Sequence, residues 1–148
     1  MDDLYDKNCR RCTLHATARQ VCTPGTGPLS SRFMVLLDSI GAEETGPVSG
    51  LAGEVLQEGL RGAGLVGQVR IESAVRCRTP AGRRPTAAEV KACSYYTEKV
   101  MAAMPNLKVV VPMGAPAAQA MGISGDVLKR AGIPVVVEYP PKETPDVL

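Results

Sequence analysis

Aromatic residues are scarce in this sequence: its 148 residues include four Tyr, one Phe (Phe33) and no Trp. A core with so few aromatic rings has to be built from Val, Leu, Ile, Ala and Met side chains. Long apolar runs are lacking too, and no segment approaches the ~20 apolar residues that a membrane-spanning helix needs. The charged N-terminus has no hydrophobic region of the kind found in signal peptides. We therefore expect a soluble, cytoplasmic protein without a membrane partner.

The chain has the length of one compact domain, since domains commonly contain roughly 100–200 residues. Its hydrophobic fraction of 45% and charged fraction of 22% are ordinary for a globular protein, which excludes a disordered tail and a long coiled coil. The 15 Gly and 12 Pro are many for a helical bundle, whereas an α/β protein with tight turns accommodates them. We expect a single domain over residues 1–148.

Positive charge is concentrated in the second half of the chain. Residues 1–69 carry six Lys or Arg against eight Asp or Glu, whereas residues 70–148 carry eleven against seven. Between Arg76 and Lys91 there are five basic residues and one acidic residue. Such a segment could contact the phosphates of a nucleic acid, although an ordinary solvated surface has the same composition.

Five cysteines need an explanation in a chain without a secretory signal, because an odd number argues against a disulfide framework. Cys9 and Cys12 form a C-x-x-C pair, and Cys77 and Cys93 form a second, wider pair. Four thiolates in two pairs suit a structural zinc ion or an iron–sulfur cluster. Cys22 lies outside both pairs, and we interpret it as a small buried apolar residue rather than a ligand.

Strand and helix patterns alternate along the chain. Short apolar runs predict buried strands, and apolar residues spaced three or four apart predict helices. The expected strands are 33–37, 69–75, 108–111 and 134–138, and the expected helices are 50–63, 87–104 and 115–121, with a further helical turn at 127–131. Thr86 and Glu89 form a capping box before the second helix, and Pro105 ends it. The alternation predicts an α/β fold, with a four-stranded, mainly parallel sheet and helices on both faces.

The carboxyl ends of parallel strands meet at one edge of a sheet, where ligands bind in α/β proteins. In this chain these ends are residues 38–41, 73–78, 112–114 and 139–141. We expect the four segments to line one crevice. Asp38 follows the first strand, where a carboxylate is well placed for catalysis and equally suited to capping a loop.

Four motifs of this chain occur together in one protein family. They are Cys9-Arg10-Arg11-Cys12-Thr13-Leu14, the stretch from Arg19 to Gly27, Gly50-Leu51-Ala52-Gly53 with Leu56, and the block Val75-Arg76-Cys77-Arg78-Thr79-Pro80 with Arg83-Arg84-Pro85-Thr86, Glu89 and Cys93. The combination resembles the iron–sulfur uracil-DNA glycosylases of the family 4 type. The four-cysteine spacing and the Arg-Pro-Thr block are its most specific parts. The resemblance spans residues 9 to about 139 and implies a uracil-DNA glycosylase-like fold.

The resemblance also implies a cofactor and a DNA-binding loop. The implied ligands of a [4Fe–4S] cluster are Cys9, Cys12, Cys77 and Cys93, with zinc as the alternative metal. The cluster would tie the N-terminal segment to the loop after the second strand and hold the basic loop, Arg76–Arg84, beside a DNA backbone. The implied nucleic-acid contacts are Arg76, Arg78, Arg83 and Arg84.

The implied base pocket departs from the family pattern. By resemblance, its residues are Ser39, Gly41, Val48, Ser73 and Gly114, with Asp38 in place of a glutamate. Val48 provides no ring to stack on a flipped base, and Ser73 cannot make the two-point contact of an amide. Pro140 stands where the family has a late histidine, and it donates no hydrogen bond to a developing anion.

Two further features separate the chain from that pattern. The only histidine, His15, lies beside the first cysteine pair and is expected at the surface or at a cap. The sequence ends at Leu148, before the loop and helix with which family members press into the minor groove.

We therefore expect a uracil-DNA glycosylase-like iron–sulfur protein that lacks base excision and binds single-stranded or duplex DNA, such as a phage could encode. The alternative is an active divergent glycosylase in which Asp38 orients a water molecule and uracil or another modified base is excised. A third alternative is a zinc-stabilised α/β module whose partner is a protein, for instance of replication or repair. Of the neighbours Tyr95 and Tyr96 we expect one in the core and one at the surface, where it could mark an interface.

Overall fold

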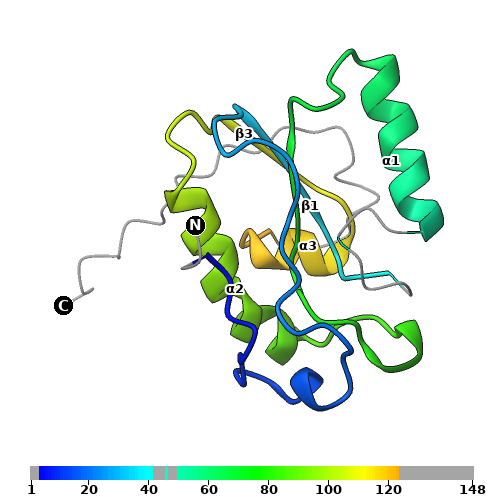
Figure 1. Cartoon of the computed structure of the whole chain (residues 1–148), viewed down its shortest axis with the longest axis vertical. Helices are drawn as coiled ribbons and strands as arrows, with labels where there is room; N and C mark the ends of the chain where they lie inside the picture. Colours follow the sequence, from blue (N-terminus) through cyan, green and yellow to red (C-terminus); the bar gives the residue numbers. More distant parts are fainter. Residues whose placement is uncertain (1–3, 42–45, 47–49, 124–148) are drawn as a thin grey trace.

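The computed structural model describes residues 4–41, 46 and 50–123 (Figure 1). Strands and helices alternate along this part of the chain: β1 (Phe33–Leu37), α1 (Gly50–Gly62), β2 (Arg70–Ser73), α2 (Ala87–Ala102), β3 (Val109–Pro112) and α3 (Ala115–Ala120). Two short 3-10 helices, η2 (Thr13–Ala16) and η3 (Pro80–Gly82), lie in the connecting segments. In the described part of the chain, no helix combines the length and the hydropathy that crossing a membrane requires.

The described strands form one parallel sheet in the order β2–β1–β3. Val35 of β1 lies opposite Ile71 of β2 and Val111 of β3. The chain passes from β1 to β2 through α1, and then from β2 across β1 to β3 through α2. The chain thus first moves from β1 to one side of the sheet and then returns across it to β3 on the other side. The junction between β1 and β3 is a topological switch point, where ligands bind in sheets of this kind. The fourth strand and the helical turn expected at 134–138 and 127–131 lie outside the described residues.

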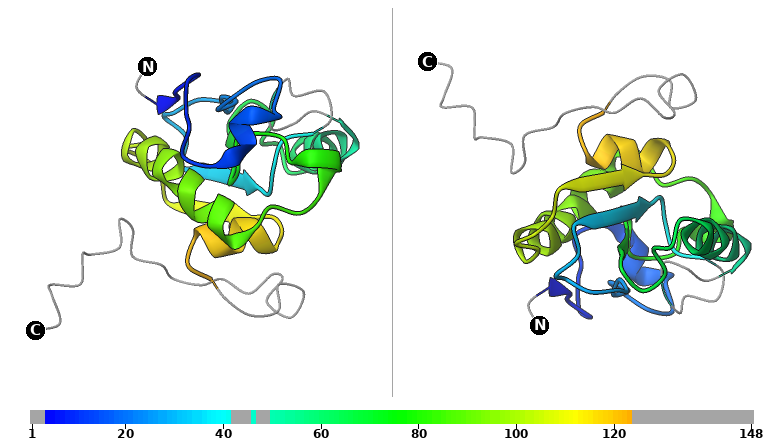
Figure 2. Two further views of the ribbon diagram at one scale, coloured as in Figure 1. Left: turned by 90° about the horizontal axis from the view of Figure 1, so that it is seen from below. Right: turned by 90° about the horizontal axis from the view of Figure 1, so that it is seen from above.

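Helices cover both faces of the described sheet because alternate residues of β1 point to opposite sides. Met34 and Leu36 are buried in a cluster with apolar residues of α2 and α3. Val35 is buried on the other face, in a cluster with Leu56 and Leu60 of α1. Figures 1 and 2 show α1 and α2 on opposite sides of the strands. The buried side chains against the sheet are aliphatic on both faces, with Met residues on the α2 and α3 side, as the scarcity of aromatic residues predicts.

The start of α2 is determined by its local sequence. The Thr86 hydroxyl oxygen accepts from the Glu89 N–H (3.2 Å), and Glu89 Oε1 accepts from the Thr86 N–H (2.8 Å). This reciprocal pair is the expected capping box. Arg83 donates to both Glu89 oxygens (2.8 and 2.9 Å), and these bonds together with the Thr86 N–H lower the pKa of Glu89 to about 2. The helix is thereby anchored to the basic loop that precedes it.

Candidate functional site

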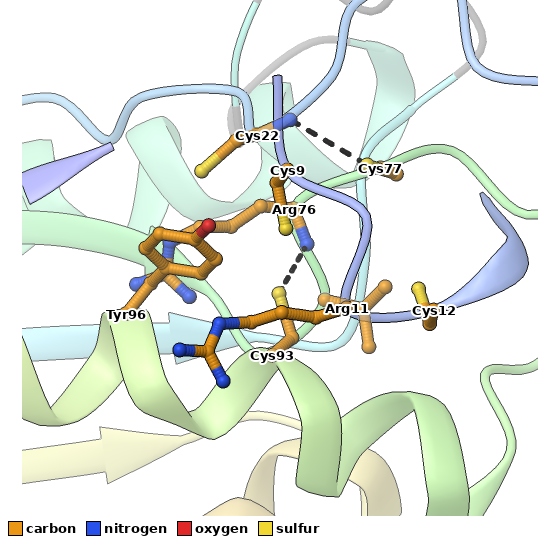
Figure 3. Close-up of a pocket in the computed structure, with 9 residues that line it drawn as sticks. Cys9, Arg11, Cys12, Cys22, Arg76, Cys77, Cys93 and Tyr96 are labelled. Carbon is orange, nitrogen blue, oxygen red and sulfur yellow. Dashed lines mark hydrogen bonds between the residues drawn. The ribbon is translucent and has the colours of Figure 1, made fainter. Parts of the chain in front are cut away.

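The four paired cysteines line one pocket, to which three separate segments contribute (Figure 3). Cys9 and Cys12 come from the N-terminal loop, Cys77 follows β2, and Cys93 lies in α2. The other residues that line the pocket are Arg11, Cys22, Val75, Arg76 and Tyr96. We call this pocket the cysteine site. The fold therefore brings together the four residues that the sequence suggests as metal ligands.

Two of the paired cysteines accept hydrogen bonds from backbone N–H groups. The Arg76 N–H donates to Cys93 Sγ (3.3 Å), and the Cys22 N–H donates to Cys77 Sγ (3.5 Å). Burial raises the pKa of Cys77 to about 11, and burial also raises the pKa of Cys93 although the charge of Arg76 opposes it. Such thiols are protonated near neutral pH, so a thiolate here needs a positive partner such as iron or zinc. Four sulfur donors in one pocket, two of them receiving N–H groups, fit a metal centre.

Cys22 is buried, as expected, yet it lines the same pocket as the paired cysteines. Its sulfur accepts a hydrogen bond from the Asp6 N–H (3.4 Å), and burial raises its pKa to about 11. Its backbone has a φ of 52°, in the left-handed region that residues other than glycine rarely adopt. Cys22 thus connects the start of the chain to the loop that carries Cys77.

Arg76 is buried, so the expectation that it contacts a nucleic acid is wrong for this conformation of the chain. Its side chain is 0% exposed. Its Nη1 donates to the Ser73 carbonyl oxygen (2.8 Å) and to Thr97 Oγ1 (3.1 Å), and its Nη2 lies 3.3 Å from Glu72 Oε2. Its Nε has no hydrogen-bond partner within the described ranges. The buried carboxylate of Glu72 holds this guanidinium inside the fold. The sequence around Arg76 gave no sign of this burial, because a run of basic residues is typical of a surface.

Glu72 is the centre of a buried charge network that joins the N-terminal segment to the sheet. Its Oε1 accepts hydrogen bonds from Arg70 Nε (3.0 Å) and from the Tyr5 hydroxyl (2.5 Å). Arg70 also donates to the Gly27 carbonyl oxygen (2.6 Å). A Cβ atom at Gly25 would lie 2.3 Å from the Glu72 carboxylate, so a glycine is needed for this close approach. The network packs the glycine-containing stretch against β2, beside the cysteine site.

Two arginines of the basic loop, Arg78 and Arg84, form no close ion pair with a carboxylate among the described residues. Arg84 is exposed and Arg78 is partly exposed. Arg83 is exposed as well, but its guanidinium is held by Glu89. Arg78 and Arg84 are therefore the members of the expected nucleic-acid-binding set that are best able to meet a phosphate.

Asp38 lies at the switch point between β1 and β3. Its Oδ1 accepts a hydrogen bond from the Ala117 N–H (3.1 Å) in the first turn of α3. Gly114 precedes this helix with a φ of 110°, and a Cβ atom there would lie 2.2 Å from Asp38 Oδ2. Burial raises the pKa of Asp38, while the Ala117 N–H and the charge of Arg84 oppose this. Asp38 therefore caps α3, which is the structural alternative to a catalytic role.

The other residues suggested for the pocket lie along the same edge of the sheet. Ser73 is 2% exposed, and its hydroxyl lies 3.5 Å from the Ser39 carbonyl oxygen. Ser39 and Gly41 are partly exposed. Val48 and the segment 139–141 lie outside the described residues. The contacts of Asp38 with α3 and of Ser73 with Ser39 show that three of the four expected strand ends meet.

His15 makes a local contact in the loop that carries the first cysteine pair. Its Nδ1 lies 2.7 Å from the Cys12 carbonyl oxygen, at the start of η2. His15 is partly exposed and contacts a carbonyl oxygen within its own turn, whereas a cap would accept from a free N–H group.

Sequence reasoning missed the buried network beside the cysteine site. The available signal was the alternation of Arg70 and Glu72 within a strand, because buried charges have to be paired. Nothing in the sequence indicated that the side chain of Tyr96 or of Cys22 would line the same pocket as the cysteine pairs.

Comparison with known proteins identifies the family. A family model described as the uracil DNA glycosylase superfamily matches residues 24–143. A type-4 uracil-DNA glycosylase of Pyrobaculum aerophilum is 39% identical over 94 residues, which are 61% of this chain and 47% of that protein. Its counterpart in Archaeoglobus fulgidus is 34% identical over 126 residues, 80% of this chain and 62% of that protein. In Thermotoga maritima the counterpart is 36% identical over 115 residues, 75% of this chain and 59% of that protein.

The matched region spans about half to three-fifths of the length of these relatives. The family-model match, over residues 24–143, includes β1, β2 and β3, the basic loop and the second cysteine pair. The match agrees with the parallel sheet, the helices on both of its faces and the strand ends that meet at the switch point. The chain belongs to the uracil DNA glycosylase superfamily.

Proposed function

We propose that this protein is a DNA-binding member of the superfamily that does not excise uracil. The observation that carries the proposal is the state of the strand ends, where Asp38 is hydrogen-bonded to α3 and Ser73 is buried. A carboxylate that caps a helix is restrained from orienting a water molecule. A buried serine offers no two-point contact to the edge of a base. Two residue types support the proposal as well. Val48 has no ring to stack on a base, and Pro140 has no N–H group that could donate a hydrogen bond.

The cofactor proposed for the cysteine site is a [4Fe–4S] cluster. Cys9, Cys12, Cys77 and Cys93 would hold it, and when bound it supplies covalent links between three chain segments. A zinc ion with four thiolates needs all four sulfurs about 2.3 Å from one point. In the described residues no three Cys, His, Asp or Glu side chains gather closely enough for a single ion. The preference for the cluster over zinc comes from the likeness to the type-4 family, because four thiolates suit either group.

The proposed DNA contacts include Arg78 and Arg84, since Arg76 is buried and Arg83 is paired with Glu89. The charge of Arg84 acts on Asp38, so the basic loop adjoins the strand ends. A phosphate bound by this loop would place a nucleotide near the switch point, where a glycosylase holds a flipped base.

A base-excision assay tests the proposal directly. Anaerobically purified protein is incubated with single-stranded and duplex DNA that contains uracil, and alkali then cleaves any abasic site. We expect no cleavage, together with salt-dependent DNA binding in a fluorescence anisotropy measurement. The type-4 enzyme of Thermotoga maritima, which is named a uracil-DNA glycosylase, serves as the positive control.

Cleavage that disappears in Asp38→Ala would overturn the proposal and establish the alternative, a divergent glycosylase that uses Asp38. Cleavage that persists in this variant and survives repeated purification would also overturn the proposal and assign excision to residues other than Asp38. Absence of both cleavage and DNA binding would also overturn the proposal and favour a protein partner.

A further inference from the structure

Two cations converge on one exposed aromatic ring beside the cysteine site. The guanidinium carbon of Arg11 lies 3.7 Å from the centre of the Tyr95 ring, and Lys99 Nζ lies 5.1 Å from the same centre. Tyr95 is 40% exposed, whereas its neighbour Tyr96 is buried. Figure 3 shows the Arg11 side chain extending from its loop across α2. The tyrosine expected at the surface is therefore Tyr95, and it already has two positive charges next to it.

Among the described residues, no carboxylate lies close enough to neutralise either cation. In the described ranges, neither Arg11 nor Lys99 forms an ion pair with Asp or Glu. Glu98 is exposed beside Lys99 in the sequence and lowers the net charge of the surface without forming such a pair. A tyrosine ring offers each cation about 0.5–1 kcal/mol at an exposed site. That attraction does not remove the repulsion between them, whereas an anion would.

The positive charge continues along α2. Lys91, Tyr95 and Lys99 follow one another at intervals of four residues, so they lie on one side of the helix. At about 1.5 Å of rise per residue, Lys91 and Lys99 are about 12 Å apart along the helix axis. One strand of DNA advances about 3.4 Å per phosphate, so the stripe matches the length of three to four nucleotides. Arg10 is exposed next to Arg11 and adds a further charge.

We propose that Arg11, Tyr95 and Lys99 form a phosphate-binding surface that receives the DNA backbone outside the basic loop. The surface rests on the proposed binding of DNA and names a second place where the DNA is held. Because Arg11 lies between Cys9 and Cys12, the loop that supplies two ligands of the cysteine site also supplies a phosphate contact. Arg11 covers the ring of Tyr95, so the surface binds phosphate by charge and does not need to stack a base.

The test measures DNA affinity against salt concentration for the cluster-containing protein, with labelled single-stranded and duplex DNA that lacks uracil. The double variant Arg11→Gln/Lys99→Gln removes two phosphate contacts. We expect the slope of log K against log salt to fall by about 1.4 on single strands and about 1.8 on duplex DNA. Glu98→Gln, which removes the acid from the same surface, should raise the affinity.

The matched control is Arg61→Gln/Arg32→Gln, which changes the net charge by the same amount. Arg61 lies on α1, across the sheet from α2, and Arg32 precedes β1. We expect this control to leave the slope unchanged. Lys99→Gln alone lies outside the cysteine loop, and it should lower the slope by about half as much while the bound iron stays constant.

An unchanged slope in both Lys99→Gln and the double variant, with salt-dependent binding in the unmodified protein, would overturn this surface and leave the proposed function standing. If the unmodified protein shows no salt-dependent DNA binding at all, the proposed function is overturned, and the surface that rests on it is overturned as well. An equal loss of slope in the control and in the double variant would show that only net charge matters, which would also overturn the surface.

Discussion

The cysteine site and the strand ends at the switch point lie close along the chain, since Ser73 ends β2 and Cys77 follows four residues later. In the cysteine site all four expected ligands are present, and side chains and N–H groups from three segments surround them. At the strand ends the polar groups that are present are used by the protein itself. Asp38 binds α3, and the hydroxyl of Ser73 lies against Ser39.

This difference in how the polar side chains are used indicates that the two sites are under different structural constraints. A metal centre that joins distant segments contributes to folding, so losing one ligand affects the whole domain. A base pocket contributes only to binding and chemistry, and under the proposed function its residues are available for capping and packing. The buried network around Glu72 lies between the two sites, because Arg76 contacts both Ser73 and Cys93.

The largest effect should come from Cys93→Ser. Loss of one of four ligands should release the bound iron and abolish cooperative unfolding, because structural metal sites supply on the order of 10 kcal/mol of folding free energy. Iron content, visible absorption and a thermal melt followed by circular dichroism measure this. Cys22→Ala is the matched control, since it removes a buried thiol of the same pocket outside the ligand set, and it should retain the iron. Full iron content in Cys93→Ser would contradict the ligand assignment.

A smaller loss of stability is expected from Glu72→Gln, which leaves Arg70 and Arg76 without their buried negative partner. Breaking a buried ion pair on one side typically costs about 3–5 kcal/mol. The control is Glu58→Gln, which breaks the exposed pair with Arg61 and should cost at most about 0.5 kcal/mol. The urea midpoint of unfolding, measured for both variants in their iron-containing form, tests this difference in stability. Similar midpoints for the two would show that the network does not join the two sites.

The smallest effect should come from Asp38→Asn at the strand ends. Asparagine keeps an oxygen that accepts from the Ala117 N–H and removes a charge that burial disfavours. Because the pKa of Asp38 is raised in the folded state, its contribution to stability is present below the unfolded pKa and is lost as pH rises through the folded pKa.

Asp38→Asn should therefore lose less stability than the unmodified protein as the pH rises above about 4, the usual pKa of an aspartate, and thermal melts at a series of pH values measure the difference. Asp38→Ala removes the acceptor as well and should cost about 0.5–2 kcal/mol, as for the loss of a helix cap. A pH dependence identical in Asp38→Asn and the unmodified protein would show that Asp38 is not the group that titrates.

Patterns within short stretches of sequence predicted the described strands and helices, because these elements depend mainly on neighbouring residues. The apolar run at Phe33–Leu37 and the capping box of Thr86 and Glu89 specify a strand and a helix start through neighbours in the sequence. Parallel pairing followed from the alternation of strands and helices. The basic segment predicted an exposed side chain at Arg76, which is buried instead. A count of charges does not reveal that a buried carboxylate, here Glu72, pairs with one of the arginines.

The sequence by itself determined the order of the described elements, the family and the set of paired cysteines, since these depend on residue types at fixed spacings. Only the tertiary structure decided that Cys22 lies beside Cys77, that Asp38 caps α3, and that Arg11 rests on Tyr95. Each of these contacts joins residues 55, 79 or 84 positions apart. Spacing along the chain says nothing about such contacts, because the packing of whole helices and strands brings the residues together.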